Sequence, residues 1–419
     1  MSTEFDALFP ESDVPFPYRC SNIDPNRKRE PEGFATRSIH NGGDYRDQTG
    51  AVTPPIYATS TFEYGNAGGF DYTRSGNPNF RNLESVLQSL EKAEYATVFS
   101  SGVAAITAVV STLQSGDTVL AEENVYGCTF RLFDRVFKKF GVDVTYMDFT
   151  DEANFEAIER LRPRLVWLES PTNPLLKIID IERAAVHCHR AGATLLVDNT
   201  FASGFTQQPL QLGAHLSLSS TTKYINGHSD CLGGVVCTND PKWAEELVFA
   251  QKALGLNPSP FDTWLIARGV KTLALRMKQH QANARGLAEW LEKKPGVKWV
   301  RYPGIPSHPD YMLACRQMRG GGSGVVVADL GLPLEQTRAF LQQLRFFKMA
   351  ESLGGVESLI CHPASMTHAS VPREVREKVG ITDAVVRFSV GIEELDDLLA
   401  DLEAGFERVG AYARSYHLT

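Results

Sequence analysis

Several residue types that could take part in catalysis follow short apolar runs of this chain. The first is Lys223, which stands behind a run of hydroxyl residues in LSLSSTTKYINGHSD, residues 216–230. A lysine at the end of an apolar strand is partly desolvated, so its amine is more readily neutral and nucleophilic. A single lysine after a strand is more commonly an ordinary surface residue, so its position alone leaves both interpretations open.

A carboxylate ends another apolar run. Asp198 closes the run in LLVDNTF, residues 195–201. A carboxylate is costly there unless it has a cationic or hydrogen-bonding partner, and strand ends in open parallel sheets are where ligands bind. The alternative is an ordinary helix cap after a strand.

A strand-to-helix turn and an aromatic ring complete the set. In FSSGVAA, residues 99–105, the turn would present backbone N–H groups at a helix N-terminus to an anion, although a tight turn alone would look the same. Tyr126 occurs at a second such junction, where it could stack on a planar ring or serve as a packing residue. A nucleophilic amine, a buried carboxylate, an anion cradle and a stacking ring are together the groups that hold pyridoxal 5′-phosphate (PLP).

The elements that must position these residues follow a regular pattern. Short apolar runs separated by helical patterns predict strands at 97–99, 118–121, 144–149, 165–168, 194–197 and 216–218. This alternation predicts crossover units and a mostly parallel sheet. Farther on, the pattern predicts a smaller α+β domain, with a long helical region at 262–293, strands at 324–330 and 385–390, and helices at 333–344 and 393–408.

The chain is predicted to have three parts. An N-terminal arm and a long structured loop occupy residues 1–76, a large domain residues 77–274, and the α+β domain residues 275–419. The first 33 residues, rich in proline and charge, are expected to form an exposed arm that is poorly ordered unless a partner holds it.

The composition is that of an ordinary globular protein. The 419 residues include 42 Lys+Arg and 50 Asp+Glu, a formal net charge of −8, and 43% are hydrophobic. The acidic balance argues against a nucleic-acid partner, and no apolar run approaches the roughly 18–20 residues of a membrane span. An acidic start and seven scattered cysteines without a CxxC pair predict a cytoplasmic protein with neither a disulfide framework nor a thiolate zinc site.

Motifs that would indicate other kinds of site, such as a nucleotide or metal site, are weaker. The glycine-rich RGGGSG, residues 319–324, lacks the Lys-Ser/Thr end of a phosphate-binding loop and predicts a turn into a strand. HExxH and a GxGxxG after an early strand are both missing from the sequence, and Cys361-His362 with His368 is a weak metal cluster better interpreted as a loop. We therefore expect no metal site and no nicotinamide site.

Longer motifs identify a family. The chain resembles the Cys/Met-metabolism family of PLP-dependent enzymes from about residue 34 to about residue 410. The resemblance is carried by these segments: YTRSGNP (72–78), SSGVAA (100–105), ESPTNP (169–174), VDNTF (197–201), TKYINGHSD (222–230), AESLGGVESL (350–359), MTHAS (366–370) and RFSVGIE (387–393). It implies the aspartate-aminotransferase-like fold (fold type I), in which a mostly parallel seven-stranded sheet forms the large domain and a smaller α+β domain follows.

The resemblance also implies roles for individual residues. Lys223 would bond covalently to PLP and carry protons, Asp198 would keep the pyridine nitrogen protonated, and Tyr126 would stack on the ring and help expel the leaving group. The phosphate would be held by the backbone amides of Gly102 and Val103, by the side chains of Ser220 and Thr222, and by Tyr72 and Arg74 from a neighbouring subunit. Arg387 would clamp the substrate α-carboxylate, with Asn173, Ser352 and Thr200 lining the site around it. The expected assembly is a homotetramer built from two dimers that share their sites.

The expected reaction is α,γ-elimination of L-cystathionine, the activity of a cystathionine γ-lyase. Glu351 resembles the γ-lyase and γ-synthase branch, where an acidic group can receive the distal ammonium of cystathionine, and Asp71 could add a second acid near Tyr72. Cys128 in YGCT instead resembles methionine γ-lyase, and FRLFD, residues 130–134, is closer to γ-synthase. Cystathionine γ-synthase and methionine γ-lyase therefore remain alternatives.

Overall fold

The computed structural model describes residues 33–42, 50–367 and 373–416. The expected N-terminal arm up to residue 32 and the histidine at position 368 lie outside the described residues. Within the described ranges no helix is long and apolar enough to cross a membrane.

The larger sheet has seven strands in the order β1-β7-β6-β5-β4-β2-β3. The strands are β1 (Tyr95–Phe99), β2 (Thr118–Glu122), β3 (Asp143–Met147), β4 (Leu165–Glu169), β5 (Thr194–Asp198), β6 (Leu216–Ser219) and β7 (Gly234–Thr238). The five strands from β6 to β3 run parallel, and β7 is antiparallel to both of its neighbours. The mostly parallel seven-stranded sheet is thus confirmed.

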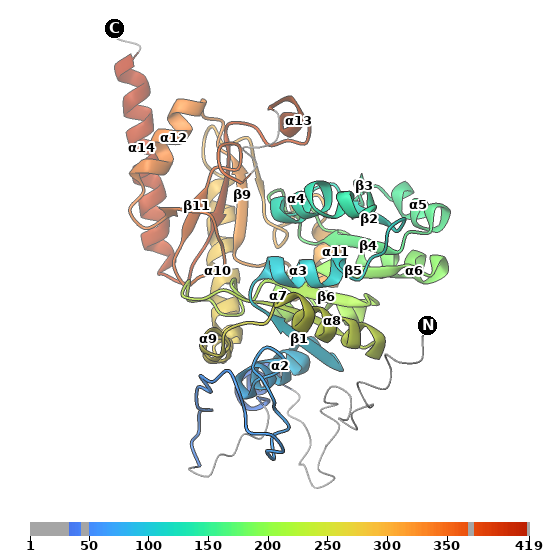
Figure 1. Cartoon of the computed structure of the whole chain (residues 1–419). Helices are drawn as coiled ribbons and strands as arrows, with labels where there is room; N and C mark the ends of the chain where they lie inside the picture. The colour runs from blue at the N-terminus through green and yellow to red at the C-terminus, as the bar shows by residue number, and fades with distance from the viewer. Residues whose placement is uncertain (1–32, 43–49, 368–372, 417–419) are drawn as a thin grey trace.

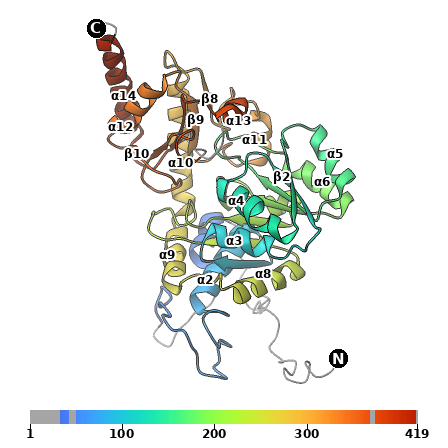
Figure 2. The ribbon, with the colours of Figure 1, turned by 45° about the horizontal axis from the view of Figure 1, so that its top comes forward.

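Helices cover both faces of this sheet (Figures 1 and 2). They are α1 (Phe34–His40), α2 (Pro78–Glu91), α3 (Gly102–Val110), α4 (Gly127–Arg135), α5 (Ala153–Leu161), α6 (Ile181–Ala191), α7 (Ser203–Thr206) and α8 (Pro241–Leu254), with 3₁₀ turns at Phe137–Phe140 and Pro209–Leu212. Alternate residues of β4 enter different cores: Trp167 packs with α3, α4 and α8, while Leu168 packs with α5 and α6. Every residue of β4 and β5 is buried, as expected of central parallel strands.

The second sheet has the order β10-β11-β12-β9-β8. Its strands are β8 (Trp299–Arg301), β9 (Val325–Asp329), β10 (Lys348–Met349), β11 (Leu359–Cys361) and β12 (Val385–Ser389), accompanied by α11 (Tyr311–Gln317), α12 (Leu334–Gln343), α13 (Arg373–Lys378) and α14 (Leu395–Tyr416). This confirms a smaller sheet domain after the large one. The predicted boundary at residue 275 falls inside α10 (Leu273–Leu291), which contacts α1 and α7 as well as β8, β9 and α14.

The helical region predicted at 262–293 is two helices, not one. The first, α9 (Pro260–Val270), ends just before Lys271, and α10 begins at Leu273. The buried Arg276 guanidinium donates to the carbonyl oxygens of Gly269, Tyr224 and Ile225. The break between the helices therefore lets one arginine tie α9 and α10 to the segment just after Lys223.

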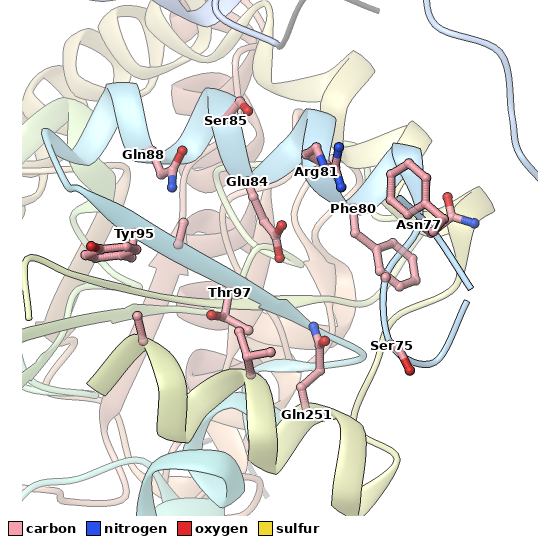
Figure 3. Close-up of a pocket in the computed structure, with 15 residues that line it drawn as sticks. Ser75, Asn77, Phe80, Arg81, Glu84, Ser85, Gln88, Tyr95, Thr97 and Gln251 are labelled. Carbon is pink, nitrogen blue, oxygen red and sulfur yellow. The ribbon is translucent and has the colours of Figure 1, made fainter. Parts of the chain in front are cut away.

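A small cavity of about 110 Å³ lies between α2, β1 and α8 (Figure 3). Glu84 reaches it from α2 and Gln251 from α8. The Val98 N–H of β1 donates to Glu84, and Gln251 donates to the Val98 carbonyl. The two side chains thus satisfy the backbone N–H and carbonyl of Val98 on the outer edge of the sheet. Unpaired backbone groups at such an edge otherwise invite pairing with another chain.

Candidate active site

The site lies at the carboxyl ends of the parallel strands, facing the second sheet. Glu169 and Asp198 end the neighbouring strands β4 and β5, and both are buried. Lys223 follows β6, and the N-terminus of α3 follows β1. This is the edge at which ligands bind in open α/β sheets.

Lys223 is held by the second sheet's domain. Its Nζ donates to Ser352 Oγ at 2.7 Å. Burial, together with the nearby positive charge of Arg387, lowers the pKa of Lys223 to about 8, although Glu351 opposes the shift. The amine is therefore far more readily neutral, and hence nucleophilic, than an exposed lysine.

Asp198 is 6% exposed, and no cation bonds to it among the described residues. Burial raises its pKa to about 6, although hydrogen bonds from Thr200 counteract this. The Thr200 N–H donates to Asp198 Oδ1 at 3.0 Å, and Thr200 Oγ1 accepts the Ser220 N–H at 2.9 Å. Such a carboxylate is complementary to a protonated ring nitrogen.

The N-terminus of α3 forms an anion cradle. Ser101 Oγ accepts the Ala104 N–H, which leaves the Gly102 and Val103 N–H groups without a hydrogen-bond acceptor in the part of the chain that the structure describes. A Cβ at Gly102 would lie 2.9 Å from the Ser220 Cβ, so only glycine lets these two segments approach so closely. Thr222 Oγ1 donates to the Gly233 carbonyl at 3.2 Å and accepts the Gly233 N–H at 3.0 Å.

The second sheet contributes a buried guanidinium to the site. Arg387 of β12 is 3% exposed, donating to Asn173 Oδ1 and to the Ser352 carbonyl, both at 3.0 Å. Its buried Nε has no acceptor among the described residues. Spare donor capacity on a buried guanidinium fits a carboxylate ligand.

Tyr126 stands at the start of α4 and is 41% exposed. Burial, a hydrogen bond with the Cys128 thiol and the charge of Glu351 all raise its pKa, while Arg131 opposes the shift. Arg131 Nη2 lies 2.8 Å from Cys128 Sγ. The structure thus brings Tyr126, Cys128 and Glu351 together near Lys223.

Two predicted site residues lie apart from this cluster. Tyr72 pairs its backbone with Thr61 in the 50–76 loop and is 43% exposed. Arg74 donates to the Lys252 carbonyl of α8 and lies over the Tyr72 ring. No hydrogen bond within the described ranges connects either residue to Lys223 or Arg387, so within a single chain they do not complete the site.

Sequence reasoning missed Glu169. Its carboxyl group accepts the N–H groups of Tyr126 and Asn173. The available signal was the one used for Asp198, because LVWLE also ends an apolar strand with an acid. Glu169 and Asp198 are partners in the register of β4 and β5.

The comparisons with known proteins agree with this geometry. The profile of the Cys/Met-metabolism PLP-dependent enzyme family matches residues 35–407. Cystathionine γ-lyase of Dictyostelium discoideum is 46% identical over 90% of this chain and 98% of its own length, and cystathionine β-lyase of Coxiella burnetii is 45% identical over 88% and 96%. A crystal structure of cystathionine γ-synthase from Xanthomonas oryzae pv. oryzae in complex with cystathionine, 44% identical, covers 91% of this chain and 100% of that chain with a TM-score of 0.87.

The chain belongs to the Cys/Met-metabolism family of PLP-dependent enzymes. Its cofactor is therefore pyridoxal phosphate, and its substrates are sulfur amino acids. The site fits this cofactor: it has a desolvated amine at Lys223, an uncompensated carboxylate at Asp198 and open N–H groups at Gly102 and Val103. The fold and cofactor predicted from the sequence are confirmed.

Proposed function

We propose that this enzyme is a cystathionine γ-lyase, which converts L-cystathionine to L-cysteine, 2-oxobutanoate and ammonia by α,γ-elimination. The observation that carries the proposal is the placement of Glu351. It is exposed, yet close enough to Lys223 and Tyr126 to influence the charge of both. A carboxylate there can receive the distal ammonium of cystathionine while the reacting carbons lie beside Lys223.

Cofactor binding rests on five side chains and two amides. Lys223 would bond covalently to PLP, Asp198 would keep the ring nitrogen protonated, and Tyr126 would stack on the ring. The phosphate would be held by the remaining groups: the Gly102 and Val103 amides and the Ser220 and Thr222 hydroxyls. Thr200 lines the site beside them and bonds to Asp198. Bound in this way, PLP supplies an electron sink for the negative charge that develops on the substrate.

Side chains of the protein orient the substrate and transfer the protons. Arg387 clamps the substrate α-carboxylate, with Asn173 and Ser352 beside it, and so aims the Cα hydrogen at Lys223. A neutral amine with a pKa of about 8 can accept that proton. Lys223 would also remove a proton from Cβ, whose electron pair would expel the sulfur from Cγ, and Lys223 or Tyr126 would protonate that sulfur. Water would then release 2-oxobutanoate and ammonia.

Two other activities remain candidates because specific residues favour them. Cystathionine γ-synthase shares the need for Glu351, and FRLFD at 130–134 resembles that branch. Methionine γ-lyase is favoured by Cys128, whose thiol contacts Tyr126 and Arg131. The thioether end of methionine carries no charge for Glu351 to pair with, which weighs against methionine.

We also propose that the enzyme acts in the cytoplasm as a homotetramer of two site-sharing dimers. Tyr72 and Arg74 of one subunit would complete the partner's phosphate and substrate sites. The exposed Val52 and Tyr64 on the same loop support this arrangement, since large apolar side chains at 97% and 98% exposure favour burial against another subunit. The six described cysteines are all free, as expected in a reducing compartment.

The test is a comparison of substrates on the purified yellow enzyme. L-Cystathionine, L-methionine, and O-activated homoserine with cysteine are assayed in parallel. Cysteine and 2-oxobutanoate from cystathionine, with methionine inert, support the γ-lyase. Homocysteine and pyruvate would mean β-elimination, methanethiol would favour methionine γ-lyase, and cystathionine formed in the third assay without lyase activity would favour γ-synthase.

A further inference from the structure

Glu169 is a buried carboxyl group that connects two parts of the site. It is 4% exposed at the end of β4. Its Oε2 accepts the Tyr126 N–H at 2.7 Å, and its Oε1 accepts the Asn173 N–H at 3.1 Å. Each oxygen therefore holds a different loop: Tyr126 opens α4, and Asn173 follows β4.

These two contacts begin a continuous chain of hydrogen bonds. Asn173 Oδ1 accepts from Arg387, Arg387 donates to the Ser352 carbonyl, and Ser352 Oγ accepts from Lys223. Through Glu169, the backbone of Tyr126 is thus linked to Arg387. The separation of those two residues sets how far the substrate carboxylate lies from the plane of the ring.

A purely structural role does not readily explain a carboxyl group here. Glu169 lies beside Asp198 in the sheet register, and burial together with the charge of Asp198 raises its pKa well above the usual range, while the hydrogen bonds from the Tyr126 and Asn173 N–H groups oppose the rise by favouring the ionised form with two acceptor oxygens. No cation bonds to Glu169 among the described residues. What a carboxyl group offers, and an amide does not, is two acceptor oxygens at a fixed spacing.

We propose that Glu169 is a positioning residue, whose two oxygens set the position of Tyr126 relative to the Asn173–Arg387 pair. This inference rests on the proposed function, in which Tyr126 stacks on the cofactor and Arg387 binds the substrate carboxylate. Glu169 touches neither the cofactor nor the substrate; it acts through the two amides that it holds.

The test uses Glu169→Gln in the holoenzyme. Glutamine has the same shape but presents one acceptor and one donor, so one of the two N–H groups is left facing an NH₂ group. We expect kcat/KM to fall on the order of 10- to 100-fold, with KM raised and kcat lowered together. The visible circular dichroism of bound PLP should change, because the ring's stacking partner has moved, while the enzyme stays folded.

Glu122→Gln is the matched control. Glu122 ends the adjacent strand β2, is fully buried and accepts the Phe149 and Asn124 N–H groups, neither of which belongs to the site. Its kinetics and visible circular dichroism should match the wild type. Glu169→Gln with unchanged KM, kcat and circular dichroism, or with effects no larger than those of Glu122→Gln, would overturn the proposal.

If the Glu169→Gln protein does not fold, two further measurements test the proposal. Glu169→Asp keeps the carboxyl group but is too short to reach both amides, so it should show the same kinetic and spectral changes. In the wild-type holoenzyme, the Tyr126 N–H should exchange slowly with solvent although it lies outside the helical ladder; rapid exchange there would refute the contact. If the wild type binds PLP but turns over no sulfur amino acid, the proposed function fails, while exchange and circular dichroism still test the role of Glu169.

Discussion

Lys223 Nζ donates to Ser352 Oγ at 2.7 Å, although 129 residues separate them along the chain. Ser352 has a φ of +152°, a conformation that L-residues adopt rarely and that persists only where surrounding structure enforces it. In that conformation its carbonyl accepts from Arg387 while its hydroxyl holds the lysine. The second sheet's domain thus orients the amine that follows a strand of the first.

The pH at which PLP attaches should report the environment of Lys223. Because burial and Arg387 lower its pKa from 10.5 to about 8, the amine becomes neutral as the pH rises through 8. We expect the rate of PLP attachment to the apoenzyme, followed by stopped-flow absorbance, to rise through pH 8 and then level off. A rate that keeps rising towards 10.5 would contradict this, and Lys223→Ala should show neither the covalent yellow band nor turnover.

The charge of Asp198 should lower the free energy of unfolding of the apoenzyme, although it strengthens the binding of PLP. Its pKa is about 6 in the fold and 3.8 as the reference value, so below 3.8 the carboxyl group is neutral in both states and above 6 the full cost of burying its charge is present. Asp198→Asn apoenzyme should therefore be more stable than the wild type above pH 6, by about 2–3 kcal/mol, with the difference vanishing towards pH 4.

Urea unfolding of both apoenzymes across that pH range measures the effect. The same variant should bind PLP more weakly than the wild type, because the ring nitrogen loses its counter-charge. If the wild-type apoenzyme were more stable than the variant above pH 6, the Asp198 carboxylate would have to have a cationic partner in the fold.

Glu351→Gln should affect substrates according to their distal charge. Loss of a partly exposed charge pair should raise KM for L-cystathionine about 5-fold with little change in kcat. Turnover of substrates without a distal ammonium should change less, and only through the effect of Glu351 on the charge of Lys223 and Tyr126. Glu357→Gln, the same substitution at an exposed position of the same segment, bonded to Ser229, is the control. Equal effects on charged and uncharged substrates would exclude the proposed role.

Site sharing between subunits should appear as complementation. Lys223→Ala and Arg74→Ala are each expected to have little activity alone. Co-expressed in equal amounts, they should recover about one quarter of wild-type activity, because half of the dimers are mixed and each has one intact site. No recovery in mixed dimers of verified composition would mean that Arg74 serves its own chain. Sedimentation equilibrium would test the tetramer.

The strands that carry Asp198 and Lys223 were predictable because central parallel strands are continuous apolar runs. Strand β7 was not predicted, although Gly234–Thr238 is as long as β5 and is buried throughout. The break between α9 and α10 was also missed, because Arg276 stabilises it through the carbonyl groups of Tyr224 and Ile225, which are far away in sequence. The local spacing of apolar residues gives no information about such a long-range contact.

The order of residue types along the chain by itself indicated a mostly parallel α/β sheet and the cofactor, because an amine, a carboxylate and a glycine turn each follow an apolar run. The longer motifs then identified the family by resemblance, and with it the fold type. Only the tertiary structure decided that Glu169 lies beside Asp198, that it joins Tyr126 to Asn173, and that Ser352 holds Lys223. The physical reason is strand order. Which strands become neighbours, and how the second sheet docks on the first, depends on packing between residues far apart in sequence, and those neighbours set the pKa and the position of each catalytic group.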